Sequence, residues 1–103
     1  MNFNERVWNI CKKIPKGKIS TYKILAIKLN TKAYRAVGNA LNKNPYAPKV
    51  PCHRIINSNG NIGGFAKGLK AKIKLLKKEG IKIKNKKVID FEKVLYKLKQ
   101  EDL

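Results

Sequence analysis

Three residues with complementary chemistry stand out in this chain of 103 residues: Cys52, His53 and Glu79. A cysteine becomes a useful nucleophile as its thiolate, which a neighbouring base and nearby positive charge both favour. His53 is the only histidine, and Glu79 ends a run over residues 6–78 that holds 18 positive charges and no carboxylate. The set could supply a nucleophile, its base and an acid that orients the base, which is the chemistry of covalent transfer to a thiol.

The positions of these residues along the chain limit what they can do unaided. Adjacent side chains diverge in extended backbone, so contact between Cys52 and His53 requires a local turn or a bridging water. Glu79 is expected at the C-terminus of a helix, where the helix dipole disfavours an acid and the residues one turn back are leucines. It either orients His53 or is a solvated acid beside two lysines, and the spacing leaves both interpretations open.

The other titratable residues exclude several classes of chemistry. Glycoside hydrolysis and two-metal phosphoryl transfer need paired carboxylates, which residues 6–78 lack. One histidine with Cys11 and Cys52 does not make the four-ligand set of a structural zinc, so no metal is expected. Cys11 falls on the apolar side of a predicted helix and is interpreted as core packing.

The net charge is +19, from 25 Lys plus Arg against 6 Asp plus Glu. Such an excess attracts nucleic acid or an anionic membrane surface. Because 22 of these 25 residues are lysines, most of the positive charge is interpreted as lysines at tolerant positions on the surface. A retained arginine in such a chain indicates a site that needs a planar guanidinium, and the arginines are Arg6, Arg35 and Arg54.

No segment of this sequence is expected to direct it to a membrane or to export. No run of 18 apolar residues occurs, and the first residues, MNFNERVW, lack the charged start and apolar run of a signal peptide. We therefore expect a cytoplasmic or nucleoid-associated protein that is not secreted and that keeps both cysteines reduced.

Apolar periodicity predicts a mostly α-helical fold in which residues 1–103 form a single domain. The predicted elements are helices over 3–14, 21–29, 33–42 and 67–79, a hairpin over 81–88 and a last helix that Asp90 caps and that includes Leu98. The lysines of the fourth helix are expected to face solvent. The second and third helices form a helix-turn-helix pattern, which is typical of DNA-binding proteins.

Two loops complete the predicted architecture. Three prolines within residues 45–51 forbid a helix and predict an extended, semi-rigid path into Cys52. Gly63-Gly64-Phe65 predicts a second loop, whose backbone can approach a ligand closely. A stiff loop is a suitable support for a reactive thiol.

Several motifs in order resemble the catalytic domain of the O6-alkylguanine-DNA alkyltransferases. They are Ile19-Ser20-Thr21-Tyr22, Arg35-Ala36-Val37-Gly38, Asn44-Pro45, Val50-Pro51-Cys52-His53-Arg54-Ile55-Ile56, Gly63-Gly64-Phe65 and Leu75-Leu76-Lys77-Lys78-Glu79-Gly80. The match runs from about residue 3 to residue 80, whereas 81–103, the hairpin and last helix, match weakly. The resemblance implies a winged helix-turn-helix-like domain that moves an alkyl group from guanine O6 in duplex DNA to its own cysteine, once and without a cofactor.

The resemblance also implies a role for each matching residue. Cys52 is the acceptor, His53 acts through a water as its base, and Glu79 orients His53. Asn44 braces the active-site turn, and Tyr22 crowds the target phosphate and hydrogen-bonds the guanine. The expected contacts with the DNA minor groove are Arg35, which fills the space of the flipped base, and Thr21, Tyr22, Lys23, Asn30, Lys32, Ala33, Ala36, Gly38, Asn39 and Ser58.

The expected substrate pocket consists of Ile55, Phe65, Ala66 and Lys67. Lys67 stands where the family often has glycine, so the pocket is expected to favour small alkyl groups. Many members carry an additional N-terminal domain, which is expected to be absent here, and the chain is expected to act as a monomer.

Other functions remain as alternatives. An alkyltransferase-like protein binds and flips damaged guanine without repairing it, but such proteins carry tryptophan where this chain has Cys52. A basic helix-turn-helix regulator leaves the Pro-Cys-His-Arg loop unexplained. A Cys-His peptidase would need a substrate cleft that the composition does not indicate.

Overall fold

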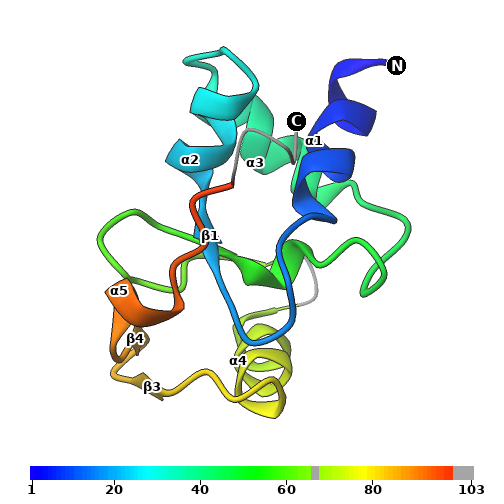
Figure 1. Ribbon diagram of the computed structural model, residues 1–103. Helices are drawn as coiled ribbons and strands as arrows, with labels where there is room; N and C mark the ends of the chain where they lie inside the picture. Colours follow the sequence, from blue (N-terminus) through cyan, green and yellow to red (C-terminus); the bar gives the residue numbers. More distant parts are fainter. Residues whose placement is uncertain (66–67, 99–103) are drawn as a thin grey trace.

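The structure, a computed structural model, describes residues 1–65 and 68–98, which form two tiers (Figure 1). Helices α1, α2 and α3 make the upper tier, and α4 with the hairpin β3–β4 makes the lower tier. The predicted mostly helical fold class is confirmed. In chain order the elements are α1 (Phe3–Cys11), β1 (Ser20–Thr21), α2 (Tyr22–Lys28), α3 (Tyr34–Asn42), the 3-10 turn η1 (Cys52–Arg54), β2 (Ile55–Ile56), α4 (Leu69–Lys78), β3 (Ile83–Lys84), β4 (Lys87–Val88) and α5 (Phe91–Val94).

Local sequence signals explain where the helices of the upper tier begin. Asn2 and Glu5 form a capping box at the start of α1, with the Glu5 N–H donating to Asn2 Oδ1 at 2.8 Å. The Thr21 hydroxyl accepts the Ile24 N–H at 3.0 Å and caps α2. Asn30, with φ of 57°, makes the break before α3. The predicted helix-turn-helix unit is therefore present.

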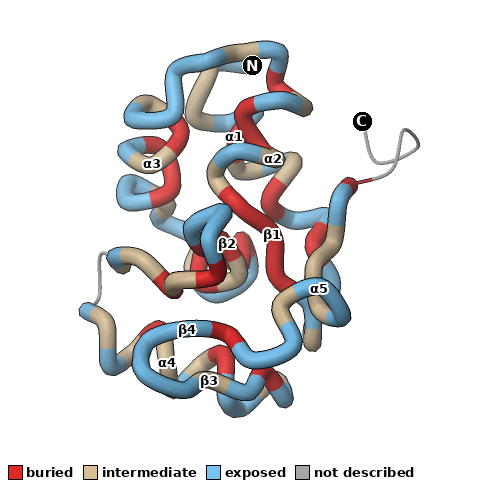
Figure 2. Tube along the Cα trace, turned by 90° about the vertical axis from the view of Figure 1, so that its left-hand side faces the viewer, coloured by how far each residue is buried: buried red, intermediate tan, exposed pale blue. Residues whose placement is uncertain are grey.

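The two tiers meet at a parallel pair of short strands that the sequence did not predict. Ser20 of β1 pairs with Ile55 of β2, and Thr21 pairs with Ile56. Buried apolar side chains form two clusters, an upper cluster that includes Val7, Leu25 and Val37 and a lower cluster that includes Ile62, Leu76 and Ile81. Successive side chains of a strand point to opposite sides, so Ile55 packs into the upper cluster and Ile56 into the lower one. Both strands are buried at the centre of the molecule (Figure 2). Because β2 directly follows η1, the turn that carries Cys52 is anchored to both tiers.

The C-terminal segment only partly follows its prediction. The hairpin is confirmed, but the last helix ends at Val94 and does not include Leu98. After Val94, Leu95 is extended and pairs in parallel with Ile19: the Ile19 N–H donates to the Val94 carbonyl at 2.8 Å, and the Tyr96 N–H donates to the Ile19 carbonyl at 2.7 Å. Leu98 is buried in the upper cluster. Pairing with Ile19 thus replaces the helix that the apolar spacing predicted, and Asp90 makes no side-chain cap.

Helix α4 overturns one prediction about its surface. Its lysines do not all face solvent, because Lys72 is fully buried while Lys70 and Lys74 are exposed. The Lys72 ammonium donates to two backbone carbonyls, which provide the polar partners that a buried charge needs. With ten residues, α4 is the longest helix described, and no helix in the described part of the chain has the length and apolarity to cross a membrane.

Candidate functional site

Cys52 begins a tight turn and not the wholly extended loop that the prolines predicted. Cys52, His53 and Arg54 form one turn of 3-10 helix, in which the Arg54 N–H donates to the Pro51 carbonyl at 2.9 Å. Both reactive side chains are almost covered, Cys52 being 8% and His53 1% exposed. The turn supplies the local bend that two adjacent side chains need in order to face a common region.

Asn44 connects the two ends of the proline-rich segment that leads into this turn. Its side-chain amide donates to the Val50 carbonyl at 2.8 Å. Its Oδ1 accepts the Tyr46 N–H at 2.9 Å. This is the geometry that a bracing residue requires.

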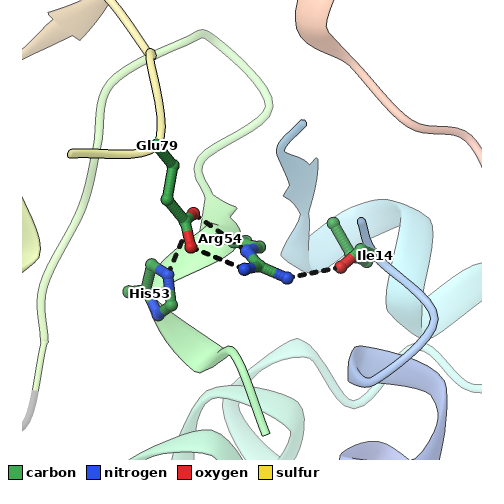
Figure 3. A network of polar contacts seen from close by, with 4 residues as sticks. All are labelled: Ile14, His53, Arg54 and Glu79. Carbon is green, nitrogen blue, oxygen red and sulfur yellow. Dashed lines mark hydrogen bonds and ion pairs between the residues drawn. The ribbon is translucent and has the colours of Figure 1, made fainter. Parts of the chain in front are cut away.

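Glu79 is the centre of a polar network with His53 and Arg54 (Figure 3). Nε2 of His53 lies 3.1 Å from Oε1 of Glu79. Arg54 donates from Nε to Oε1 at 2.9 Å and from Nη2 to Oε2 at 2.5 Å, and its Nη1 donates to the Ile14 carbonyl at 2.8 Å. Of the two interpretations left open by the spacing, contact with His53 is the one observed, and Arg54 is a further partner.

The end of helix α4 delivers the Glu79 carboxylate to the turn. Leu76 is fully buried and fixes the helix in the lower cluster. Gly80 then takes φ of 90°, a left-handed value that glycine adopts without strain and that ends the helix. Glu79 is therefore held at the helix terminus beside η1.

Burial and hydrogen bonding set the protonation states of the network. Burial lowers the pKa of His53, and the hydrogen bond with Glu79 offsets this only in part, so the imidazole is neutral at pH 7. Burial raises the pKa of Glu79, but hydrogen bonds from Arg54 and His53 outweigh it and the pKa lies below its ordinary value. Since a carboxylate only accepts, Nε2 of His53 carries the hydrogen and Nδ1 is left to accept a proton.

Acid is expected to destabilise the fold in two stages that follow from these shifts. With its pKa lowered, His53 takes up a proton more readily in the unfolded chain, so stability falls as the pH drops below 6.5. The stability that Glu79 contributes is present above its ordinary pKa of 4.5 and is lost as the pH falls through the lower folded value. Urea unfolding at about pH 7, 5.5 and 3.5 measures both stages. In Glu79→Gln the second stage should be absent, and its persistence would contradict the assignment.

Two other ionisable side chains are kept protonated by burial. Cys11 is fully buried in the upper cluster and burial raises its pKa, which confirms the predicted packing position. Burial also raises the pKa of Tyr22, so its phenol remains a hydrogen-bond donor at neutral pH. Within residues 1–65 and 68–98, no three His, Cys, Asp or Glu side chains gather as metal ligands would.

A hollow of about 550 Å³ separates α3 from the glycine loop. Its walls are Tyr22, Tyr34, Arg35, Gly38, Asn42, Asn57, Gly63, Gly64 and Phe65. Gly63 has φ of 69°, and a Cβ there would lie 3.2 Å from Oδ1 of Asn57, so this position requires glycine. Three predicted DNA contacts, Tyr22, Arg35 and Gly38, thus line the same hollow as Phe65, which is the one predicted pocket residue among its walls.

A second hollow of about 470 Å³ adjoins the first, with which it shares Tyr22, Tyr34 and Asn57. Lys23 and Ser58, both predicted contacts, line this second hollow. The two hollows together form one concave face, which we call the α3 face. It is defined by the residues that line these two hollows.

The remaining predicted residues divide into exposed and buried groups. The exposed ones are Asn30, Lys32, Ala33 and Asn39, and Ala36 is partly exposed. Thr21 and Ile55 are buried. The Thr21 hydroxyl caps α2, and the Ile55 side chain packs in the upper cluster. Their side chains are therefore committed to the fold. Ala66 and Lys67 lie outside the described residues.

Four side chains of the α3 face were missed from the sequence, namely Tyr34, Asn42, Asn57 and Asn59. Tyr34 is 48% exposed, although it is a large aromatic residue, and it lines both hollows. Asn57 also lines both and lies against Gly63. An aromatic residue on the polar side of a predicted helix, next to Arg35, was the available signal for Tyr34.

Gly38 occupies the middle of α3 without a reason inside the protein. A Cβ built at this position would meet nothing within 4 Å. Glycine within a helix nevertheless costs about 0.5–1 kcal/mol relative to alanine. The fold itself therefore does not require glycine at this position.

Comparison with known proteins finds relatives that all belong to one family. The profile of the family described as "6-O-methylguanine DNA methyltransferase, DNA binding domain" matches residues 2–81. The methylated-DNA--protein-cysteine methyltransferase of Methanosarcina acetivorans is 52% identical over 79 residues, which are 76% of this chain and 51% of that relative. The chain thus spans about half the length of the curated relatives it matches.

Solved structures share the arrangement of the elements. Mycobacterium tuberculosis OGT in complex with DNA has 39% identity and a TM-score of 0.73, covering 77% of this chain and 50% of that one. S. pombe Atl1 in complex with damaged DNA containing O6-carboxymethylguanine has 28% identity and a TM-score of 0.82, covering 93% of this chain and 95% of that one. With the profile matching most of the sequence, the chain belongs to the family of the 6-O-methylguanine DNA methyltransferases, whose DNA-binding domain it contains.

Proposed function

We propose that the chain repairs DNA by moving an alkyl group from the O6 atom of guanine in double-stranded DNA to Sγ of Cys52. The observation that carries this proposal is the network in which Glu79 holds His53, the residue next to Cys52. The family's relatives named methylated-DNA--protein-cysteine methyltransferase support the same reaction. Since the product is a stable thioether, each chain acts once.

The proposed step is a displacement at the alkyl carbon. Nδ1 of His53 takes the Cys52 proton through a water, and Glu79 stabilises the imidazolium that forms. Sγ then forms a bond to the alkyl carbon while the bond from that carbon to O6 breaks, and its electron pair leaves with the guanine. The Tyr22 phenol donates a hydrogen bond that eases departure of the guanine anion, which regains a proton from solvent. No cofactor takes part in this balance.

The α3 face is proposed to dock in the minor groove. The reacting carbon is out of reach inside a duplex, so the nucleotide must be flipped out at a cost of a few kcal/mol. Arg35 is exposed at the edge of the first hollow, where its flat guanidinium could fill the vacated stack. The small residues Ala33, Ala36 and Gly38 would allow α3 to approach the minor groove closely. The surface lysines would bind DNA phosphates without recognising the base sequence. We also propose that the protein is cytoplasmic or nucleoid-associated and acts on DNA as a monomer.

Replacing Gly38 with alanine tests this close approach. The variant should be more stable by about 0.5–1 kcal/mol, because a Cβ relieves the entropic cost of glycine and meets no protein atom. Its affinity for duplex DNA should nevertheless fall by about tenfold, since the methyl group occupies space at the groove. Urea unfolding and fluorescence anisotropy measure the two effects. A stabilised variant with unchanged affinity would mean that α3 does not enter the groove.

Stoichiometry tests the proposed reaction as a whole. Excess duplex with a radiolabelled O6-methylguanine should transfer label until one methyl group is bound per chain, and then stop. Tight binding without transfer would instead indicate a damage-binding protein of the alkyltransferase-like kind. A regulator without repair activity would bind undamaged and damaged duplexes equally.

A further inference from the structure

The lower tier carries a concentration of positive charge that the reaction proposed above does not use. Residues 68–88 hold nine lysines and one acid, Glu79. Eight of these lysines are exposed, and Lys72 is the buried one. Glu79 is paired with His53 and Arg54, and no other acid in the described part of the chain forms an ion pair. The exposed lysines of this tier are therefore not neutralised by their neighbours.

On helix α4 these lysines share one side. Lys70, Lys74 and Lys78 follow one another at intervals of four residues, which places them on the same helix face, and Lys77 lies beside them. All four are exposed. Like charges four residues apart on a helix repel one another and destabilise it. The row from Lys70 to Lys78 spans about 12 Å, since a helix rises about 1.5 Å per residue.

The hairpin β3–β4 shows the same mutual repulsion. Lys84 and Lys87 stand directly opposite each other in the strand register, where like charges are destabilising. Between them, Lys86 has φ of 62°, a left-handed value at which side chains other than asparagine and aspartate are strained. Asn-Gly is the preferred pair for such a turn, but the chain has Asn85-Lys86. A lysine is thus present at a position where the backbone favours glycine.

We call the exposed lysines of α4 and of the hairpin, together with Lys82 just before the hairpin, the lower basic surface. It belongs to the lower tier, whereas α3 belongs to the upper tier (Figure 1). None of its lysines lines either hollow of the α3 face. The protein therefore has a second cationic surface that is separate from the α3 face.

A partner for this surface must carry closely spaced negative charges, because anions between the lysines relieve their repulsion. Duplex DNA carries one phosphate per about 1.7 Å of its axis, or about seven along the row on α4. An anionic membrane also supplies charge, but surfaces that bind membranes combine basic residues with apolar side chains that insert. Among the exposed large apolar side chains of the described residues, only Ile89 adjoins this surface in the chain. Duplex DNA is therefore the better fit.

We propose that the lower basic surface binds the phosphates of a second DNA duplex while the first duplex occupies the α3 face. This inference goes beyond alkyl transfer, and it rests on the proposed docking of DNA at the α3 face. A protein held by two duplexes can pass directly from one to the other without first dissociating into solution. For a protein that acts once and must find a damaged base among many undamaged ones, such transfer shortens the search.

The test measures how fast a fluorescent duplex leaves its complex with the protein when unlabelled duplex is added. If the second duplex binds before the first one leaves, the release rate constant of wild type should rise about tenfold for a tenfold increase in unlabelled duplex below saturation. Fluorescence anisotropy in a stopped-flow instrument measures this rate constant. An undamaged duplex is used, so the result does not depend on alkyl transfer.

Two triple variants locate the second surface. The lower variant combines Lys74→Gln, Lys78→Gln and Lys84→Gln. The control variant removes the same charge from exposed lysines outside both the α3 face and the lower basic surface, by Lys12→Gln, Lys13→Gln and Lys49→Gln. In the lower variant the release rate constant should stay within about twofold over the same concentrations, whereas the control variant should respond as wild type does. The lower variant should melt no earlier than wild type, because it removes repulsion.

Each outcome decides the question. A wild-type release rate that does not depend on unlabelled duplex would overturn the inference and leave docking at the α3 face standing, and an equal rise in all three proteins would also overturn it. Earlier melting of the lower variant would contradict the repulsion that identifies the surface. Phosphatidylserine vesicles that release the labelled duplex as fast as DNA of equal charge would assign the surface to membranes instead. Failure of wild type to bind the first duplex would refute the proposed docking, and this inference with it.

Discussion

Replacing Glu79 with glutamine is expected to slow alkyl transfer to Cys52 by about 100-fold or more at pH 7. The carboxylate fixes the tautomer of His53 and balances the positive charge that His53 acquires when it takes the thiol proton. A glutamine amide can accept from one tautomer or donate to the other, so it does not select between them, and it has no charge to balance the imidazolium. Because Arg54 also loses its ionic partner while remaining largely covered, the variant should be less stable by about 3 kcal/mol. Single-turnover transfer and urea unfolding measure the two losses.

Glu92 provides a matched control for this change. It is exposed in α5, so Glu92→Gln makes the same change in charge at a site without partners for catalysis. Its transfer rate and stability should equal those of wild type. A transfer rate for Glu79→Gln within threefold of wild type, in a folded sample, would show that His53 does not depend on this acid.

Replacing Arg35 with alanine is expected to slow transfer from a duplex by about 30-fold and to leave reaction with a free alkylated base unchanged. Filling the vacated stack offsets part of the few kcal/mol that flipping costs, and about 2 kcal/mol corresponds to that factor. A free base needs no flipping. Arg35 is exposed at the hollow, so the fold should be unaffected. Rates with both substrates, taken on one preparation, separate flipping from chemistry.

Arg6 is the control for Arg35. It is also exposed, but it lies on α1 and lines neither hollow of the α3 face. Arg6→Ala removes the same charge and should leave both rates within about twofold of wild type. Equal losses with duplex and free base in Arg35→Ala would mean that Arg35 acts in the transfer step and not in flipping.

Local signals in the sequence predicted the elements that local physics forms. The Thr21 cap and the Asn30 break define the helix-turn-helix unit, and both depend on residues close in the chain. The pairing of β1 with β2 joins residues about 35 positions apart, and each strand has only two residues, too few to show a period. The same limit explains the misplaced Leu98, because the segment that leads to it is fixed by hydrogen bonds that join Val94 and Tyr96 to Ile19.

The candidate site was predictable where its residues are chemically unusual. Glu79 stood out because it closes a stretch without acids, and the structure joins it to His53. Arg54 was noticed as one of three arginines, but its partner could not be inferred, because the two residues are 25 positions apart. Lys72 was wrongly predicted to face solvent, because nothing in the sequence distinguishes this buried lysine from the other lysines among the 22. Its position depends on the carbonyls of Ile55 in β2 and of Gly64 in the glycine loop.

The central claim, that Cys52 accepts the alkyl group, is tested most directly by mass spectrometry of the tryptic peptides after reaction with an O6-methylguanine duplex. Cleavage after Lys49 and Arg54 isolates Cys52 from Cys11, which is buried in the core and serves as the internal control. We predict the added mass of one methyl group on the Cys52 peptide and none on the Cys11 peptide. An unmodified Cys52 peptide after excess substrate, or a methyl group on Cys11 instead, would contradict the account.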